Sequence, residues 1–127
     1  MPCIFMTMSW PDGKDFNPLA STKLYQDIAD AVGLDVNKVQ IHINRKPWEI
    51  LQPNGSTTLA EDVHATVEWH ERAFVVKEKI AQAIHEFCQT HGLDSDVKFD
   101  DHARNNGAFF VNGKPVVGAE YKDTEKL

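Results

Sequence analysis

The sequence predicts an α+β domain in which two tandem β-α-β units form one four-stranded mixed sheet with two helices on one face. The first observation is a repeat, because Gly33-Leu34-Asp35 and Gly92-Leu93-Asp94 each follow a stretch of helical periodicity, 59 residues apart (92 minus 33). The second is a strand-like pattern on either side of both helical stretches. The third is the length of 127 residues, which suits a single domain.

The first unit is expected over residues 1–44. Residues 3–9 (CIFMTMS) form an apolar, β-tolerant run and predict its first strand. Residues 10–14 then contain the Pro and Gly that a turn favours. Residues 39–44 (VQIHIN) alternate apolar and polar side chains, which predicts a half-buried strand parallel to the first.

A helix is expected between these two strands. Asn17 suits the N-cap and Pro18 the first helical position. Leu24, Ile28 and the following apolar residues recur at helical spacing, and Gly33 suits the left-handed position after the last turn.

Residues 45–63 break this pattern and predict a long connection with a turn at Pro53–Gly55. Few apolar residues recur there with any period. Trp48, Ile50 and Leu51 nevertheless indicate that part of the connection packs or pairs with another segment.

The second unit is expected over residues 64–101. Residues 65–71 (ATVEWHE) predict a strand, and residues 97–100 predict a short one. Between them Gly92 ends a helix with an apolar stripe, formed by Val76, Ile80, Ala83, Ile84, Phe87 and Cys88. In residues 102–127, the segments 109–111 and 116–117 flank Asn112-Gly113 and predict a hairpin, whereas the charged Tyr121–Leu127 predicts a frayed end.

Composition excludes several classes of protein. The 13 basic and 19 acidic residues give a net charge of −6, which argues against nucleic acid as a partner. No apolar run is long enough for a membrane span, and the start of the chain lacks the pattern of a signal peptide, so a cytoplasmic location is expected. Since such a sheet buries only one face against its helices, an oligomer is expected to cover the other.

Three segments carry a resemblance to a known family: Met1-Pro2 before an apolar strand, residues 39–43, and residues 100–107, which have the pattern D-x-x-A-x-N-x-G. They resemble the tautomerase superfamily, in particular proteins like macrophage migration inhibitory factor and 4-oxalocrotonate tautomerase, and the third segment looks like a stretch of the inhibitory-factor branch. The chain also looks like an uncharacterised bacterial branch near this superfamily. The resemblance implies a homotrimer with sheets around a central channel and active sites at the subunit boundaries.

In that family the amino-terminal proline is the general base, so the resemblance implies a catalytic role for Pro2 once Met1 is removed. A free α-amine has a pKa of about 7.7–8.0, and burial in an apolar pocket lowers that pKa, which leaves a neutral base at pH 7. The alternative is that Pro2 simply precedes an edge strand.

The family's usual electrophilic partners are missing from the aligned positions. Leu34 stands where the inhibitory-factor branch has a lysine, and Ser95 and Val97 stand where it has a tyrosine and an asparagine. Gln40 stands where 4-oxalocrotonate tautomerase has an arginine.

Replacements are predicted in the strand-to-helix turns. Arg72 follows the third strand and Lys14 follows the first, and either cation suits a substrate carboxylate or an enolate; a solvated turn residue is the alternative for Lys14. Trp69, Phe109 and Phe110 are candidates to line a pocket, although aromatic side chains on strands more often belong to a core or an interface.

No metal or cofactor is expected. The six histidines show no metal-ligand spacing, and the sequence has no phosphate-binding or dinucleotide fingerprint. Cys88 lies on an apolar stripe, which predicts a buried thiol, and Cys3 lies next to Pro2.

Three functions follow from these residues. The first is a cofactor-independent keto–enol isomerase of small keto acids. The second is a non-enzymatic trimeric binding protein with a vestigial Pro2. The third is an acidic interaction module that binds its partner through residues 45–63.

Overall fold

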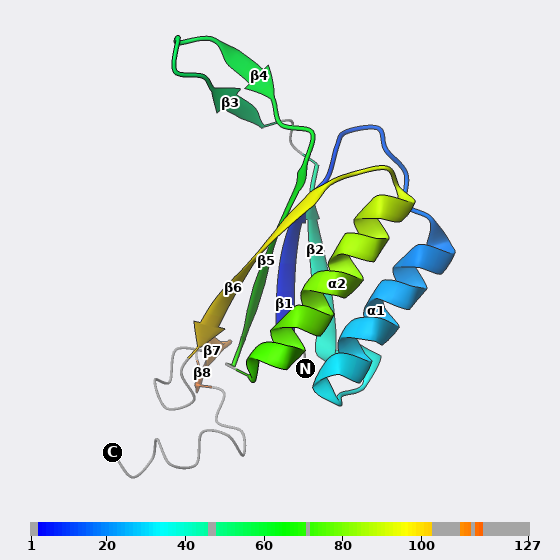
Figure 1. The fold of residues 1–127 in the computed structure, drawn as a ribbon. Coiled ribbons are helices and arrows are strands. Elements are labelled where there is room, and N and C mark those ends of the chain that lie inside the picture. The colour runs from blue at the N-terminus through cyan, green and yellow to red at the C-terminus, as the bar shows by residue number, and fades with distance from the viewer. Residues whose placement is uncertain (1–2, 46–47, 71, 103–109, 113, 116–127) are drawn as a thin grey trace.

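The computed structural model describes residues 3–45, 48–70, 72–102, 110–112 and 114–115. Four strands form one mixed sheet in the order β2-β1-β5-β6 (Figure 1). The strands are β1 (Ile4–Ser9), β2 (Val39–Asn44), β5 (Val63–His70) and β6 (Ser95–His102). Within each unit the two strands are parallel, and the units meet through the antiparallel pair of β1 and β5. The predicted α+β fold with two β-α-β units is therefore confirmed.

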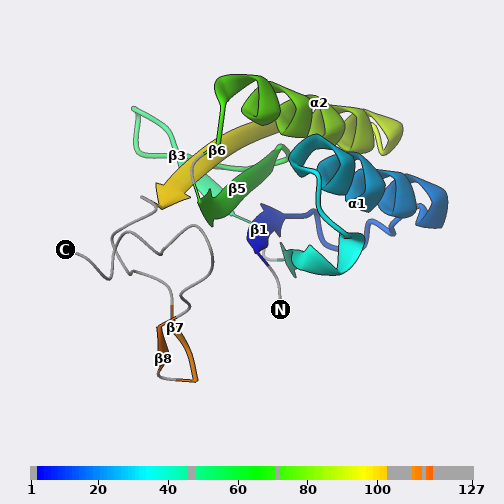
Figure 2. The same ribbon diagram turned by 90° about the horizontal axis from the view of Figure 1, so that it is seen from below.

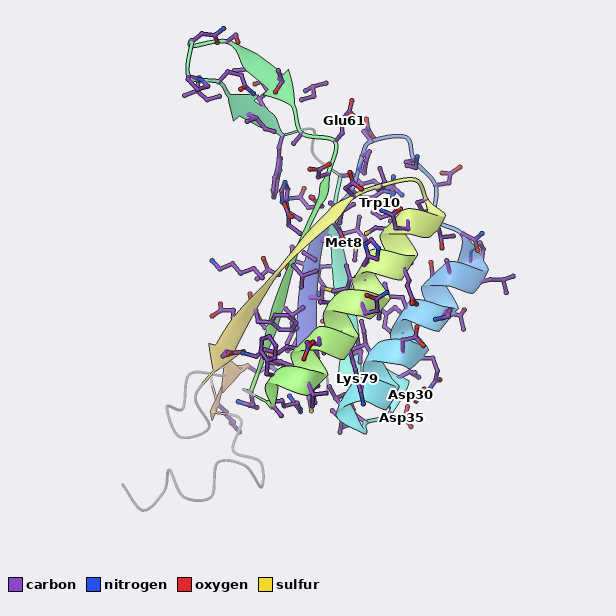
Figure 3. All side chains as sticks on the ribbon, viewed as in Figure 1. Met8, Trp10, Asp30, Asp35, Glu61 and Lys79 are labelled. Atoms are coloured by element: carbon purple, nitrogen blue, oxygen red, sulfur yellow. The ribbon has the colours of Figure 1, made fainter. Side chains whose placement is uncertain are left out.

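Helices α1 (Pro18–Val32) and α2 (Phe74–Thr90) lie side by side on one face of the sheet (Figures 1 and 2). Alternate strand residues point toward them, which is why every second residue of β5 is buried. Met8 and Trp10 belong to this core and lie on the helix side of the sheet (Figure 3). Both α1 and α2 pack against the same apolar layer, so the core occupies the space between helices and sheet.

The ends of α1 follow the sequence. The side chain of Asn17 accepts hydrogen bonds from the backbone N–H groups of Leu19 and Ala20 at 2.9 and 3.1 Å. Gly33 takes the left-handed conformation, with φ of 70°, which favours a residue without Cβ. The predicted start and end of this helix are confirmed.

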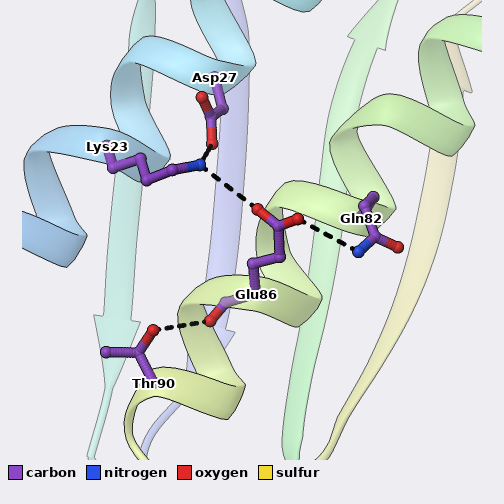
Figure 4. Close-up of polar contacts among 5 residues, drawn as sticks. All are labelled: Lys23, Asp27, Gln82, Glu86 and Thr90. Carbon is purple, nitrogen blue, oxygen red and sulfur yellow. Dashed lines mark hydrogen bonds and ion pairs between the residues drawn. The ribbon is translucent and has the colours of Figure 1, made fainter.

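Polar side chains join the two helices on their outer surface (Figure 4). Lys23 on α1 pairs with Asp27 one turn later at 2.5 Å and reaches Glu86 on α2 at 3.3 Å. Gln82 donates to the second oxygen of Glu86 at 3.3 Å. These contacts connect the exposed sides of α1 and α2, and they add little stability because water screens them.

The expectation for residues 45–63 is only partly right. The turn at Pro53–Gly55 exists, but it joins β3 (Glu49–Leu51) and β4 (Thr57–Leu59), which pair with each other as a separate two-stranded sheet. All six strand residues are exposed, so neither strand carries the apolar alternation that a half-buried strand shows. Figure 1 shows this hairpin projecting beyond the main sheet.

Two further boundaries differ from the prediction. Strand β5 begins at Val63, inside the predicted connection, and β6 continues to His102 rather than ending at 100. A C-terminal hairpin is formed by β7 (Phe110–Val111) and β8 (Lys114–Pro115), with Asn112 at φ of 51°, so its second strand precedes the predicted residues 116–117. Phe109 and residues 116–127 lie outside the described part of the chain.

The sheet face opposite the helices is largely polar. It carries Thr7 of β1, Gln40 and His42 of β2, and His64, Thr66 and Glu68 of β5. The sequence predicts that an oligomer covers this face, and its polar side chains also suit a border with water. Among the described residues, no helix is long and apolar enough to cross a membrane.

Candidate functional site

The two ends of the sheet hold the predicted site residues. At one end, which we call the Trp69 end, β1 begins and β5 and β6 finish; at the other, the Trp10 end, β1 finishes and β5 and β6 begin. Pro2 lies outside the described residues. The described chain starts at Cys3, whose backbone N–H donates to the carbonyl oxygen of Lys38 at 2.7 Å. Cys3 therefore marks the Trp69 end as the place where the chain enters the sheet.

Arg72 lies at this same end, in the turn from β5 to α2. Its guanidinium carbon is 5.3 Å from the centroid of the Trp69 ring, within range of a cation–π contact. Its Nη1 donates to the carbonyl oxygen of His70 at 3.0 Å. The guanidinium is thus held over an aromatic face while remaining only partly buried. A cation held in this way can bind a carboxylate with little further loss of side-chain entropy.

Trp69 itself is only 1% exposed, so within a single chain its ring belongs to the core rather than to the wall of a pocket. Its indole Nε1 donates to Asp101 Oδ1 at 2.6 Å, and its ring lies 5.2 Å from that of Phe99. A buried indole N–H requires an acceptor, and the strand β6 supplies one. The Trp69 ring is therefore held in place by the core and by Asp101, and it packs against the Arg72 guanidinium.

Asp101 also connects β6 to α2, because its Oδ2 pairs with Lys77 Nζ. The side chains of Lys77 and Asp101 are 20% and 25% exposed. Lys77 Nζ lies 5.7 Å from the centroid of the Phe99 ring. Within the described residues, Arg72 and Lys77 thus lie over two neighbouring rings at the Trp69 end, and Asp101 is joined to both the Trp69 indole and Lys77.

Lys77 and Asp101 were missed at the level of sequence. A signal for Asp101 exists, because Val97, Phe99 and Asp101 alternate along one face of β6, and Asp101 is the register partner of Trp69. The prediction ended this strand at 100, where two consecutive aspartates look like a turn. Lys77 carries no signal of its own within the polar positions of α2.

Lys14 lies at the Trp10 end, so the structure separates the two predicted cations. Its carbonyl oxygen accepts from Trp10 Nε1 at 2.8 Å and from Arg45 Nη1 at 3.0 Å. Its side chain borders a cavity of about 480 Å³, with Trp48 and the acidic Asp12, Glu61 and Asp62 among the lining residues. Figure 3 shows Glu61 and Trp10 at this end. Acidic neighbours compete with an anion for Lys14, which makes it the weaker candidate for an anion-binding residue.

Neither a metal site nor a reactive thiol at Cys88 is found among the described residues. Within the described part of the chain, no group of three or more His, Cys, Asp or Glu side chains is arranged to hold a metal ion. Cys88 is fully buried, and burial raises the pKa of its thiol to about 11. A thiol with such a pKa is protonated at neutral pH and unreactive.

Comparison with known proteins connects this geometry to a fold. No family model and no curated protein matches the sequence. Solved structures do match: a domain of unknown function, DUF1904, from Sebaldella termitidis superposes with a TM-score of 0.69 at 11% identity, covering 89% of this chain and 99% of that one.

Two further solved structures match over the same share of this chain. The protein Pt0534, in a crystal structure inactivated by 2-oxo-3-pentynoate, gives a TM-score of 0.64 at 16% identity. A fused 4-OT, described as a wild type asymmetric trimer, gives 0.64 at 18% identity. In both cases 87% of this chain and 94% of the other are covered. These likenesses extend over nearly the whole of each chain, so the chain shares the fold of these structures, as the sequence resemblance implied.

Proposed function

We propose that this chain, which has the tautomerase-superfamily fold, is a cofactor-independent keto–enol isomerase of small 2-oxo acids. In this proposal Pro2 is the general base and Arg72 is the anion-binding residue. The observation that carries it is the position of Arg72 at the Trp69 end, where the described chain enters β1. Sequence position already favoured Arg72 over Lys14, and the contacts of Arg72 support the same choice.

The chemistry requires a neutral amine and a nearby positive charge. After removal of Met1, the secondary amine of Pro2 takes a proton from the carbon next to the substrate carbonyl and returns it to the oxygen or to another carbon. Negative charge develops on the carbonyl oxygen during this transfer, and a fixed cation stabilises it. Arg72 has the fixed orientation that this role requires, because Trp69 and the His70 carbonyl hold it.

The choice of substrate class rests on two features. Arg72 presents a planar, delocalised cation, which matches the planar carboxylate of a 2-oxo acid. The neighbour Pt0534 is inactivated by 2-oxo-3-pentynoate, itself a small 2-oxo acid. Both features favour a compact anionic carbonyl compound over a neutral or cationic substrate.

We also propose a homotrimer. The β3–β4 hairpin projects from the domain (Figure 1) with Leu51 74% and Leu59 63% exposed, and an isolated two-stranded hairpin is marginally stable in water. Contact with a second copy would cover these side chains. Fused 4-OT structures with this fold are trimers, and the polar open face of the sheet suits the lining of a water-filled channel.

Two measurements test the enzymatic proposal. Intact mass of the untagged protein is expected to lack Met1, since a retained Met1 leaves Pro2 without a free amine. Keto–enol exchange of phenylpyruvate is expected to fall at least about 100-fold in Pro2→Ala, the scale of a lost general base. Equal rates for the two proteins would reject Pro2 as the base and favour the non-enzymatic binding protein.

The anion-binding role has its own variant. Arg72→Gln is expected to raise KM for phenylpyruvate about tenfold or more, because a charge-assisted hydrogen bond is lost. Lys79→Gln is the matched control, since Lys79 lies on α2, the helix that follows Arg72, but borders the groove between α1 and α2. An unchanged KM in Arg72→Gln would remove Arg72 from the proposal.

A further inference from the structure

The cavity at the Trp10 end has an acidic rim that the proposed function does not use. Its volume of about 480 Å³ lies within the range of pockets that bind small molecules. Asp12, Glu61 and Asp62 border it, and Lys14 is the only cation among its described lining residues. The charges of these four side chains therefore sum to −2 (1 minus 3).

The three carboxylates of the rim are not neutralised by the described part of the chain. None of them forms a hydrogen bond or an ion pair there, and the Lys14 ammonium group forms none either. Arg45 lies nearby, but its Nη1 donates to the Lys14 carbonyl oxygen at 3.0 Å and its guanidinium carbon is 4.9 Å from the centroid of the Phe16 ring. An incoming cation therefore has no existing partner to displace from the rim.

An aromatic side chain adjoins the acidic rim. Trp48 borders the cavity and is 41% exposed. Its ring stacks on that of His64, with 5.8 Å between the centroids and 11° between the planes, so the imidazole covers one face of the indole. Cations bind favourably over an indole face, and no side-chain cation of the described residues lies over this ring.

A buried hydroxyl group is the third feature of the cavity. Ser9 borders it and is only 7% exposed. Its Oγ accepts from the backbone N–H of His64 at 2.8 Å, whereas its own proton has no acceptor within the described residues. Since buried polar groups are almost always hydrogen-bonded, the Ser9 proton is available to an oxygen atom of a bound molecule.

We propose that this cavity binds a small organic cation that carries an ammonium group and a neutral oxygen atom, such as an amino alcohol. The carboxylates and the Trp48 ring attract the ammonium group, and the oxygen accepts from Ser9. The net charge of −6 favours a cation in the same way. The inference does not rest on the proposed isomerase, because the cavity lies at the end of the sheet opposite Arg72.

The experiment is calorimetric titration of the full chain with three probes, 4-amino-1-butanol, 1,4-butanediol and 4-hydroxybutyrate, which share a hydroxyl group and differ in charge. The wild type is expected to bind the amino alcohol with a dissociation constant in the millimolar range and about tenfold more tightly than the diol. The anion is expected to bind more weakly than the diol. The proposal is overturned if the amino alcohol binds no better than the diol, or if the anion binds best.

The rim itself is tested by Glu61→Gln combined with Asp62→Asn, which is expected to weaken binding of the amino alcohol about fivefold. Asp30→Asn combined with Glu78→Gln is the matched control, because it removes the same two charges from the groove between α1 and α2. Figure 3 shows Glu61 at the Trp10 end and Asp30 at the other end of the molecule. The control is expected to keep the wild-type affinity within about twofold. Equal losses in the two double variants would overturn the assignment to this cavity.

Two further measurements keep the test decisive if the acidic double variant folds poorly. Trp48→Ala is expected to lower the affinity for the amino alcohol about threefold, because the cation loses the indole face. In the wild type, butylamine is expected to bind about threefold more weakly than the amino alcohol, since it lacks the oxygen that accepts from Ser9. An unchanged affinity in Trp48→Ala, or equal affinities for the two amines, would overturn the proposed site.

Discussion

Trp10 and Trp69 occupy equivalent positions in the two repeats, 59 residues apart (69 minus 10), and each is 1% exposed. Their indole N–H groups nevertheless meet different acceptors. Trp10 donates to the backbone carbonyl of Lys14 at 2.8 Å, whereas Trp69 donates to the side-chain carboxylate of Asp101 at 2.6 Å. Every residue offers a backbone carbonyl as acceptor, whatever its side chain. A carboxylate acceptor, in contrast, places a charge at the edge of the core.

The surroundings of the two rings differ in the same way: uncharged rings surround Trp10, and charged side chains adjoin Trp69. Trp10 packs among aromatic rings, with centroids at 4.6 Å to Phe16, 5.4 Å to Phe87 and 5.0 Å to His91. Trp69 carries Arg72 and adjoins the Lys77–Asp101 pair. The repeat therefore places an equivalent tryptophan at each end of the sheet. The Trp10 ring packs against other aromatic rings, whereas the Trp69 ring contacts charged side chains.

The largest expected effect is a loss of stability that is similar at both ends. It tests whether the two tryptophan rings contribute equally to the core. Trp10→Ala and Trp69→Ala are each expected to lower the free energy of unfolding by about 3–5 kcal/mol, the cost of a large core cavity. Urea unfolding followed by circular dichroism measures both. A loss below about 1 kcal/mol at either position would show that its ring is not part of the core.

The next effect concerns Cys88, close to the Trp10 end. Its pKa in the folded protein is about 11 against an ordinary value of 9.0, because burial disfavours the thiolate. Its contribution to stability is therefore complete below pH 9 and is lost as the pH rises toward 11, by roughly 2–3 kcal/mol. Unfolding free energies measured at pH 8 and at pH 11 are expected to differ less in Cys88→Ala than in the wild type. Identical differences in both proteins would contradict the burial of a neutral thiol.

A smaller effect separates the carboxylates of the two ends. Asp101→Ala leaves the Trp69 indole and Lys77 without their acceptor and is expected to cost about 1–3 kcal/mol. Asp12→Ala is expected to cost less than about 0.5 kcal/mol, because Asp12 is exposed and makes no hydrogen bond or ion pair within the described part of the chain. Thermal or urea unfolding compares them. Equal losses would mean that Asp101 is not structurally engaged.

The smallest effect belongs to His91 at the Trp10 end. Its Nδ1 lies 2.8 Å from the Phe87 carbonyl oxygen, and its Nε2 accepts from the backbone N–H of Asn17 at 2.9 Å. Together these contacts join the end of α2 to the start of α1. His91→Phe keeps a ring but removes both bonds, so a loss of about 1 kcal/mol is expected in urea unfolding. No loss would show that ring packing alone connects the helices.

Most of the fold follows from local signals in the sequence. The caps at Asn17 and Gly33 and the alternation in residues 39–44 specify one β-α-β unit, and the repeat supplies the second. The β3–β4 hairpin escaped prediction because both of its faces are exposed, so burial imposes no pattern on it. Its turn at Pro53–Gly55 was still visible, since a turn depends on backbone conformation rather than on packing.

The site was less predictable than the fold. Arg72 was proposed from its place at the end of a strand and Trp69 as an aromatic side chain on that strand, but the contact between them depends on a rotamer. Asp101 and Lys77 come from different elements, 24 residues apart (101 minus 77), and meet only through tertiary packing. The matching strand-to-helix turns of the two units also suggested Lys14 and Arg72 as alternatives for binding the same anion, whereas the antiparallel pairing of β1 and β5 places them at opposite ends.

The most direct test of the difference between the ends uses the indole N–H signals. In a ¹⁵N-edited NMR spectrum, the signals of Trp10 and Trp69 can be assigned from Trp10→Phe and Trp69→Phe. Titration with 2-oxobutyrate is expected to shift the Trp69 signal, which lies beside Arg72 and Asp101, and to leave the Trp10 signal in place. A shift of the Trp10 signal without a shift of the Trp69 signal would contradict the assignment of anion binding to the Trp69 end.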